Sequence, residues 1–190
     1  MGYVGIANAV LLAQQNKVVG VDICEARVNA INARKSPIID VDISHYLAEK
    51  KLDLSASTDL IATVVGADYV IVSTPTNYDD KTNNFDTSIV NNVIMEICNS
   101  QQHNPLILIK STVSVGYTQN AKEQFKNPNI IFSPEFLREA SAIEDNLNPS
   151  RIIVGEDSVN GRKIARIFQN ISQNNPKLIF MSSSEAEAVK

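Results

Sequence analysis

The chain has 190 residues, of which 44% are hydrophobic and 20% are charged, and its net charge is −4. This composition is typical of a globular domain with a sizeable buried core, and the acidic balance argues against a nucleic-acid partner. We recognise no signal peptide and no apolar run of membrane-spanning length, so we expect a cytoplasmic protein without membrane contact. Cys24 and Cys98 share no metal-ligand spacing with His45 or His103, which predicts reduced thiols and no metal site.

The first segment predicts a dinucleotide-binding site. Gly2-Tyr3-Val4-Gly5 opens an apolar helix, and a β-branched strand follows that ends at Asp22. In the fingerprint G-x-G-x-x-G, the second glycine lets the backbone approach a pyrophosphate and the third lets the helix pack closely on the sheet. Gly2 and Gly5 match these two, while the first glycine and the first strand do not precede them. The alternative is an ordinary helix that begins at a glycine after a turn.

Asp22 stands where a carboxylate would accept both hydroxyls of the adenosine ribose and repel a 2′-phosphate, which favours NAD over NADP. A helix is expected over residues 25–34, and Arg27 would lie one turn into it, near the adenosine ribose or phosphate. The alternative for Arg27 is a solvated helix charge. A short helix over 45–50, an extended segment over 54–57 and a helix capped by Asp59 are expected next.

Three buried strands with polar ends follow. They are expected over residues 68–73, 106–109 and 129–132, and such continuous apolar runs are typical of a parallel sheet covered on both faces. Ligands bind at the carboxyl ends of the strands in open α/β sheets. The polar residues at these ends are Thr74, Pro75, Thr76, Asn77 and Tyr78, then Lys110, Ser111 and Thr112, then Ser133, Pro134 and Glu135. We therefore expect hydroxyls and carboxylates to converge at one edge of the sheet.

Two features of the connecting segments suggest roles. A helix capped by Asp86 would turn Ile89, Val93 and Ile97 inward, flanked by Val90 and Ile94. Glu135 and Glu139 would share one face if their segment were helical, as candidates for acid–base chemistry or for binding sugar hydroxyls. The alternative is a solvated charged turn in which these carboxylates pair with Arg138 and Arg151.

The last third continues the alternation with a strand over 151–155, a helix over 159–171 and a strand over 177–180. Ser184 and Glu187 predict a capping box that opens a last helix. The whole pattern predicts an α/β chain with a Rossmann-like, doubly wound parallel sheet whose first strand is missing from the sequence.

In the strand order 3-2-1-4-5-6 the missing strand is the central one, and its loss would exceed the usual stability of roughly 5–15 kcal/mol. We therefore expect a gene fragment rather than a natural functional unit; a cooperative melt followed by circular dichroism would contradict this. We assign residues 1–183 to the NAD-binding domain and 184–190 to the start of a helix that leads to absent domains.

Six blocks of sequence together resemble the bacterial UDP-glucose 6-dehydrogenases of the UDP-glucose/GDP-mannose dehydrogenase family. They are residues 2–5, 73–79, 110–116, 133–139, 148–151 and 184–190. The resemblance covers the amino-terminal NAD-binding domain of such enzymes. It implies a two-step oxidation of UDP-glucose to UDP-glucuronate with NAD, and a homodimer for the full-length protein.

The resemblance also implies roles for individual residues. NAD would contact Gly2, Tyr3, Val4, Gly5, Asp22, Arg27, Thr74, Pro75, Thr76, Thr112 and Glu139, although the family often has Lys where Arg27 stands. The UDP-sugar would contact Glu135, Phe136, Leu137, Arg138, Glu139 and Lys190. Thr112 would line the reacting centre, Glu139 would handle the water that hydrolyses a thioester intermediate, and Lys190 would stabilise developing oxyanion charge.

One departure from the family bears on catalysis. The family's nucleophilic Cys, in a Gly-rich loop, has no counterpart here, because Cys24 follows the ribose-binding strand and Cys98 ends a helix. Without a thiolate no covalent intermediate forms, so we expect the chain as written to be inactive alone. The alternatives are a dehydrogenase of another nucleotide sugar (GDP-mannose or a UDP-N-acetylhexosamine) and a non-catalytic NAD-binding module. Binding of NAD without turnover of any nucleotide sugar would indicate the module.

Overall fold

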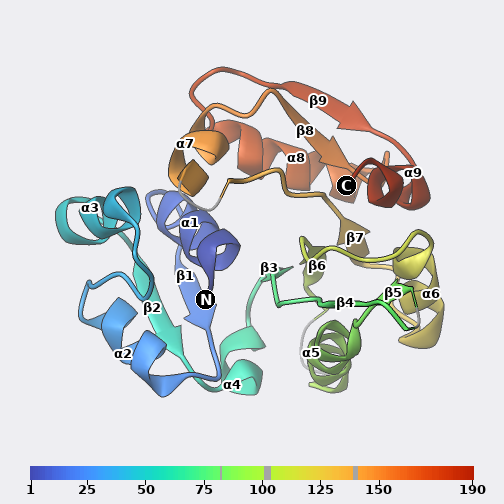
Figure 1. Cartoon of the computed structure of the whole chain (residues 1–190), viewed down its shortest axis with the longest axis horizontal. Helices are drawn as coiled ribbons and strands as arrows, with labels where there is room; N and C mark the ends of the chain where they lie inside the picture. Colours follow the sequence, from blue (N-terminus) through green and yellow to red (C-terminus); the bar gives the residue numbers. More distant parts are fainter. Residues whose placement is uncertain (82, 101–103, 139–140) are drawn as a thin grey trace.

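The computed structural model describes residues 1–81, 83–100, 104–138 and 141–190. It confirms the alternation of helices and strands (Figure 1). In chain order the elements are α1 (Tyr3–Leu12), β1 (Val18–Val21), α2 (Glu25–Asn32), α3 (Val41–Glu49), β2 (Leu54–Ser57), α4 (Leu60–Val64), β3 (Tyr69–Val72), β4 (Tyr78–Asp79), β5 (Asn84–Phe85), α5 (Ser88–Asn99), β6 (Leu106–Ile109), α6 (Tyr117–Gln124), β7 (Ile130–Phe132), α7 (Ala142–Leu147), β8 (Arg151–Val154), α8 (Val159–Ile171), β9 (Lys177–Phe180) and α9 (Ser183–Val189).

The strands in the described part of the chain form three parallel sheets and one antiparallel hairpin. The parallel sheets are β1–β2, β3–β6–β7 with β6 in the middle, and β8–β9; the hairpin is β4–β5. Figure 1 shows β1–β2 with α1, α2 and α3 at the left, β8–β9 with α8 across the top, and β6 and β7 with α5 and α6 at the right. The parallel α/β class is thus confirmed, whereas the predicted single sheet is divided among these groups.

The start of α1 lies between the first two parallel sheets. A Cβ atom added at Gly5 would lie 3.1 Å from the Ser73 Oγ atom, just past β3, and one added at Gly20 in β1 would lie 2.9 Å from the Met1 Cε atom. Met1 and the first turn of α1 therefore fill the space between β1 and the end of β3. This contact brings the glycine motif next to the polar end of β3.

Burial explains where the sequence pattern was correct and where it was not. All four residues of β6 are buried, as the apolar run predicts for a central strand. In α5 the buried residues are Val90, Ile94 and Ile97, whereas Ile89 is 48% exposed, so its predicted inward position is wrong. Residues at i, i+4 and i+7 share one face of a helix, and here that face begins at Val90.

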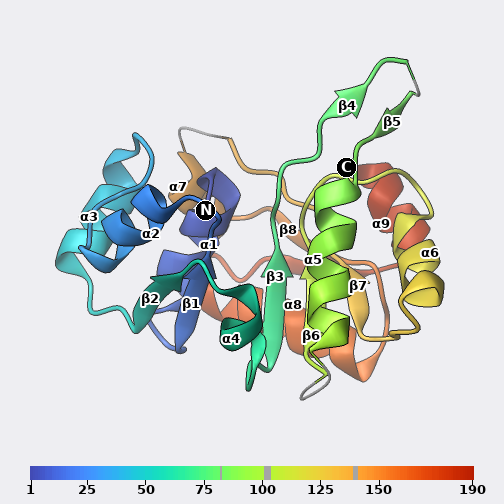
Figure 2. The same ribbon diagram turned by 90° about the horizontal axis from the view of Figure 1, so that it is seen from below.

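The β4–β5 hairpin and the helix α7 were not predicted from the sequence, because their segments are only two to six residues long. The β4–β5 hairpin projects from the body of the molecule (Figure 2), and the Tyr78 and Phe85 rings pack edge to face with their centroids 5.3 Å apart. The helix α7 has no counterpart among the elements expected from the sequence. No helix in the described part of the chain is long and apolar enough to cross a membrane.

The capping box of the last helix lies two residues earlier than predicted. The Ser182 hydroxyl accepts a hydrogen bond from the Glu185 backbone N–H, and the Glu185 carboxylate accepts one from the Ser182 backbone N–H. The predicted pair, Ser184 and Glu187, has the same spacing, so spacing alone could not separate them. The Glu187 carboxylate is turned toward α6 instead.

Replacing Gly155 by alanine should destabilise the fold by about 1–3 kcal/mol, the usual range for an extra methyl group in a packed interior. The added Cβ would lie 3.0 Å from the Ser183 Cα atom, 3.1 Å from the Phe132 carbonyl oxygen and 3.2 Å from the Ala186 Cβ atom. Urea unfolding followed by circular dichroism measures the change. An unchanged midpoint would show that α9 can move off β8 without cost.

Stability should fall as the pH rises from about 10 to about 12 because of Tyr117. Burial raises the pKa of this phenol from 10.0 to about 12, and its hydroxyl donates to the Asn91 Oδ1 atom at 2.6 Å. A folded-state pKa above the unfolded value gives stability that is present below the unfolded pKa and is lost through the folded pKa. Thermal melts across this pH range, compared with Tyr117→Phe, measure the effect; equal slopes for the two proteins would contradict it.

Candidate functional site

The polar ends of three strands lie side by side. The Lys110 backbone N–H donates to the Val72 carbonyl at 2.8 Å, and the Ser133 backbone N–H donates to the Ile109 carbonyl at 3.0 Å. The Ser111 hydroxyl donates to the Thr74 carbonyl at 2.7 Å. The segments that follow β3, β6 and β7 therefore begin at one edge of one sheet, as the sequence predicts.

A buried charge cluster joins α1 to this edge. Glu135 and Lys110 are both buried, and the Lys110 Nζ atom lies 3.2 Å from the Glu135 Oε2 atom. The same oxygen accepts a weak hydrogen bond from the Asn8 amide at 3.4 Å. The Lys110 Nζ atom also lies 4.3 Å from the centre of the Phe168 ring, a cation–π distance. Through Asn8, the helix that carries the glycine motif touches the segment predicted to bind a sugar.

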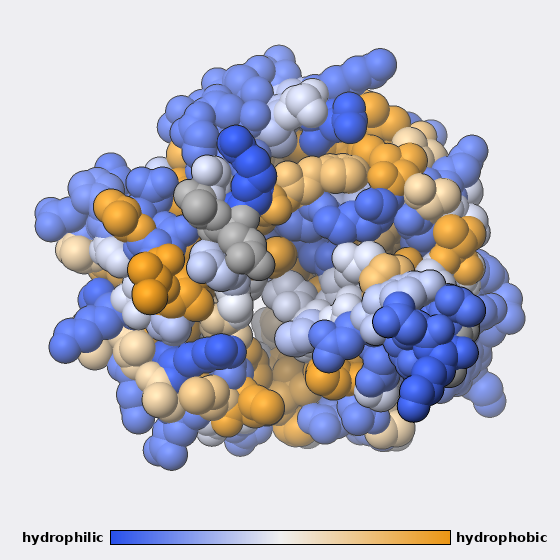
Figure 3. Space-filling view, in the orientation of Figure 1, coloured by the Kyte–Doolittle hydropathy of each residue, from blue (hydrophilic) through white to orange (hydrophobic). Residues whose placement is uncertain are grey.

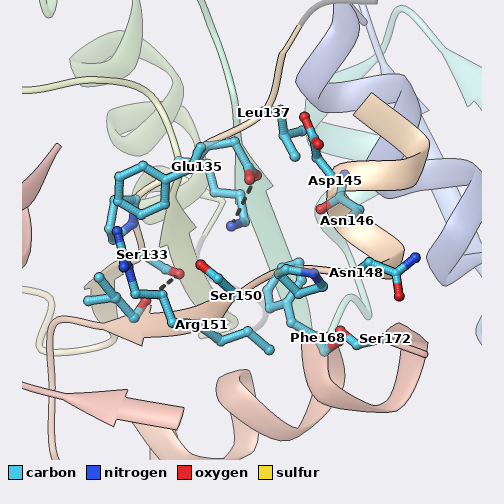
Figure 4. A pocket seen from close by; sticks show the side chains of 16 residues that line it. Ser133, Glu135, Leu137, Asp145, Asn146, Asn148, Ser150, Arg151, Phe168 and Ser172 are labelled. Carbon is cyan, nitrogen blue, oxygen red and sulfur yellow. Dashed lines mark hydrogen bonds and ion pairs between the residues drawn. The ribbon is translucent and has the colours of Figure 1, made fainter. Parts of the chain in front are cut away.

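A cavity of about 250 Å³ lies beside this cluster. Glu135, Leu137, Asn146, Arg151 and Phe168 are among its lining residues, and in Figure 4 their side chains surround a common space. Its volume would hold about eight water molecules at roughly 30 Å³ each, or a polar group of similar size. Figure 3 shows that the face seen in Figure 1 is hollowed near its middle, where blue and white residues predominate.

Lys190 reaches the same segment from α9. Its Nζ atom donates to the Glu135 backbone carbonyl and lies 5.5 Å from the centre of the Phe136 ring. The Arg151 guanidinium lies 5.6 Å from that ring, so two cations share one aromatic side chain. Burial lowers the pKa of Lys190, while the Glu135 carboxylate raises this pKa and the Lys110 cation lowers it.

Residues 133–138 are not helical, so the expectation that Glu135 and Glu139 share a helix face is wrong for this part; Glu139 lies outside the described residues. Pro134 favours an extended residue before it, and Glu135 is held by Lys110 across the sheet edge. The alternative pairing is also wrong for Glu135, which binds Lys110, while the Arg138 guanidinium binds Asp145 through two contacts of 2.7 and 3.1 Å.

The predicted cofactor end is built around Asp22, which is buried at the end of β1. Its carboxylate accepts the Cys24 backbone N–H at 2.8 Å, lies 3.4 Å from the Arg27 Nη1 atom, and binds the α-amino group of Met1. Burial lowers the pKa of this α-amino group. Arg27 therefore lies beside this carboxylate with its side chain 47% exposed, and its contact with a cofactor stays a prediction.

The other predicted cofactor residues are partly accessible. Gly2 is the N-cap of α1 and is exposed, and Tyr3, Val4 and Gly5 in the first turn are half-buried. Thr76 and Thr112 are half-buried and Pro75 is exposed. The buried Thr74 Oγ1 and Asn8 Oδ1 atoms have no hydrogen-bond partner within the described residues.

Sequence reasoning missed three residues of this site: Asn8, Lys110 as a buried ion partner, and Glu187. Asn8 is a polar residue in an otherwise apolar helix, a signal that could have found it. Lys110 was identified only as a polar strand end. Glu187 was assigned to the wrong cap.

Comparisons with known proteins agree on one family. The family model described as "UDP-glucose/GDP-mannose dehydrogenase family, NAD binding domain" matches residues 1–172. The chain is 44% identical to a UDP-glucose 6-dehydrogenase of Campylobacter jejuni over 193 residues, which cover 100% of this chain and 49% of the relative. It is 48% identical to one of Streptococcus pneumoniae over 168 residues, covering 88% of this chain and 42% of the relative. The chain thus spans about half the length of these curated relatives.

Solved structures agree. A crystal structure of a ternary complex of GDP-mannose dehydrogenase from Pseudomonas aeruginosa matches with a TM-score of 0.87 and 25% identity, covering 100% of this chain and 46% of that one. A UDP-glucose dehydrogenase from Pyrobaculum islandicum matches with a TM-score of 0.85 and 24% identity, covering 99% and 46%, which supports the fold. The chain belongs to the UDP-glucose/GDP-mannose dehydrogenase family and contains its Rossmann-type NAD-binding domain.

Proposed function

We propose that the whole protein oxidises UDP-glucose to UDP-glucuronate with NAD, and that this chain supplies the cofactor site and one wall of the sugar site. The observation that carries the proposal is the identity of 44% and 48% to two UDP-glucose 6-dehydrogenases, against 30% and 28% to two GDP-mannose 6-dehydrogenases. In this proposal residues 1–183 form the NAD-binding domain, and 184–190 begin the helix that leads to further domains of a cytoplasmic homodimer.

The residues at the N-terminal end of α1 fit NAD. An added Cβ at Gly2 would meet nothing within 4 Å, so the helix N-terminus is open to a diphosphate, which its backbone N–H groups favour. Asp22 would accept the adenosine ribose hydroxyls in place of its present donors. Thr74, Pro75, Thr76 and Thr112 would line the nicotinamide half. NAD, when bound, supplies the hydride acceptor.

The segment after β7 would hold the UDP-sugar. Residues 136–138 form a non-helical segment with exposed or half-buried side chains. Their backbone groups can bind hydroxyls. The Lys190 amine, which now donates to the Glu135 carbonyl, could stabilise an oxyanion on the sugar. The roles of Glu139 with water and of Thr112 at the reacting centre complete this proposal.

Calorimetric titration tests the proposal. NAD is titrated first, and UDP-glucose, GDP-mannose and UDP-N-acetylglucosamine are each titrated into the NAD-saturated chain. We expect saturable NAD binding and the tightest binding for UDP-glucose. Tighter binding of another sugar nucleotide would favour a dehydrogenase of that sugar, and NAD binding with no sugar nucleotide bound would favour the non-catalytic module.

A further inference from the structure

We propose that Glu187 is a positioning residue that holds the Thr112-bearing loop and the Lys190-bearing end of α9 in a fixed relation. The inference rests on the proposed function, because the roles of Thr112 and Lys190 belong to it. The position of Glu187 itself does not depend on that function and can be measured separately.

The Glu187 carboxylate is buried, and its hydrogen-bond donors all lie at the N-terminus of α6. Glu187 as a whole residue is 4% exposed. Its two carboxylate oxygens accept three hydrogen bonds from the start of α6. The donors are the Gly116 backbone N–H at 2.5 Å, the Thr118 backbone N–H at 2.8 Å and the Thr118 hydroxyl at 2.5 Å. A carboxylate bound in this way is fixed at both oxygens.

The Glu187 carboxylate supplies the N-terminal cap that the N-cap residue of α6 does not provide. The N-cap residue of α6 is Gly116, which has no side chain to bind the free N–H groups and adopts a left-handed conformation with φ of 90°. A carboxylate is the favoured group at a helix N-terminus, both as a hydrogen-bond acceptor and as a negative charge. Gly116 ends the loop that begins at Lys110 and carries Thr112, so Glu187 fixes the end of that loop.

The other side of the contact is α9, whose first turns pack beside the end of β8. Ala186 is fully buried, and Gly155 leaves the space in which α9 packs against β8. Lys190 follows one turn after Glu187, and its backbone N–H donates to the Glu187 carbonyl at 3.3 Å. A shift of Glu187 away from α6 would therefore move the Lys190 amine relative to Glu135 and Phe136.

Amine labelling across pH measures the position of Lys190. The intact chain is acetylated with acetic anhydride at a series of pH values, and modification at Lys190 is followed by mass spectrometry. Burial holds the pKa of Lys190 below the usual lysine range; the Glu135 and Lys110 charges act on it, and Arg151 lies against the same Phe136 ring. Release of α9 would expose the amine and shift the labelling midpoint upward.

Four variants make the test specific. Glu187→Gln places an amide donor against backbone donors, and Thr118→Val removes one donor; both should raise the labelling midpoint of Lys190. Thr118→Ser keeps the hydroxyl and should restore the wild-type midpoint. Glu185→Gln changes the same charge in the same helix but only at the exposed capping box, and should leave the midpoint unchanged.

The outcomes separate this proposal from the proposed function. A folded Glu187→Gln chain with the wild-type midpoint, or Thr118→Val indistinguishable from Thr118→Ser, would overturn the positioning role. If Glu187→Gln fails to fold, the Thr118 pair decides. Failure of wild-type chain to bind NAD or UDP-glucose in the titrations would overturn the proposed function without changing the labelling result.

Discussion

Replacing Lys110 by methionine should destabilise the folded chain by about 3–5 kcal/mol, the range for breaking a buried ion pair by removal of one partner. The side chains of Lys110 and Glu135 are 5% and 10% exposed, and their charged atoms are 3.2 Å apart. Methionine would leave the Glu135 carboxylate buried with, among the described residues, the weak Asn8 contact at 3.4 Å as its remaining side-chain hydrogen bond. A loss of this size is a large part of the roughly 5–15 kcal/mol of a typical domain.

Urea unfolding with matched variants measures this effect. Lys122→Met makes the same substitution in a pair with Glu156 whose side chains are each 24% exposed, and should cost about 0.2–1 kcal/mol, as more accessible ion pairs do. Adding Glu135→Gln to Lys110→Met should recover part of the loss, because the second change removes the unpaired charge. Equal destabilisation by the two lysine substitutions would contradict a special role for burial.

Local pattern was enough to predict most elements of this fold. The runs that became β3, β6, β8 and β9 are short and apolar, and the helices between them show one buried face each. Asp59 caps α4 as expected, since its carboxylate accepts the Ala62 N–H within the same turn. What local pattern could not give is how the strands divide into sheets, because pairing depends on partners far apart in the chain.

The same distinction holds for the site. Asp22 and Arg27 are five residues apart, so their contact follows from one strand and one helix turn. Asn8, Lys110 and Glu135 come from three distant segments, and only the fold brings them together. Glu187 was assigned to its own helix because a capping box is a local motif, whereas its real partners lie 69 and 71 residues away. Hydrogen bonds between residues this far apart have no characteristic spacing in the sequence, so a local motif cannot predict them.

Replacing Asp22 by asparagine should weaken NAD binding by about 10- to 100-fold, because hydrogen bonds to a charged group contribute about 1.5–3 kcal/mol. Asparagine keeps the shape of the side chain but accepts less well from two ribose hydroxyls. It also no longer repels a 2′-phosphate, so the preference for NAD over NADP should narrow. Calorimetric titration of both cofactors into wild type and variant measures the two changes.

The control for this experiment is Asp157→Asn, which removes a carboxylate from the loop between β8 and α8. Asp157 pairs with Arg162 at 2.5 Å, and both side chains are more than half exposed. This variant should bind NAD as the wild type does, which excludes a general effect of lowering the negative charge. Wild-type affinity in Asp22→Asn would instead mean that the ribose lies elsewhere. In that case the contacts of Asp22 with Arg27 and the Cys24 backbone would serve only to hold the turn after β1.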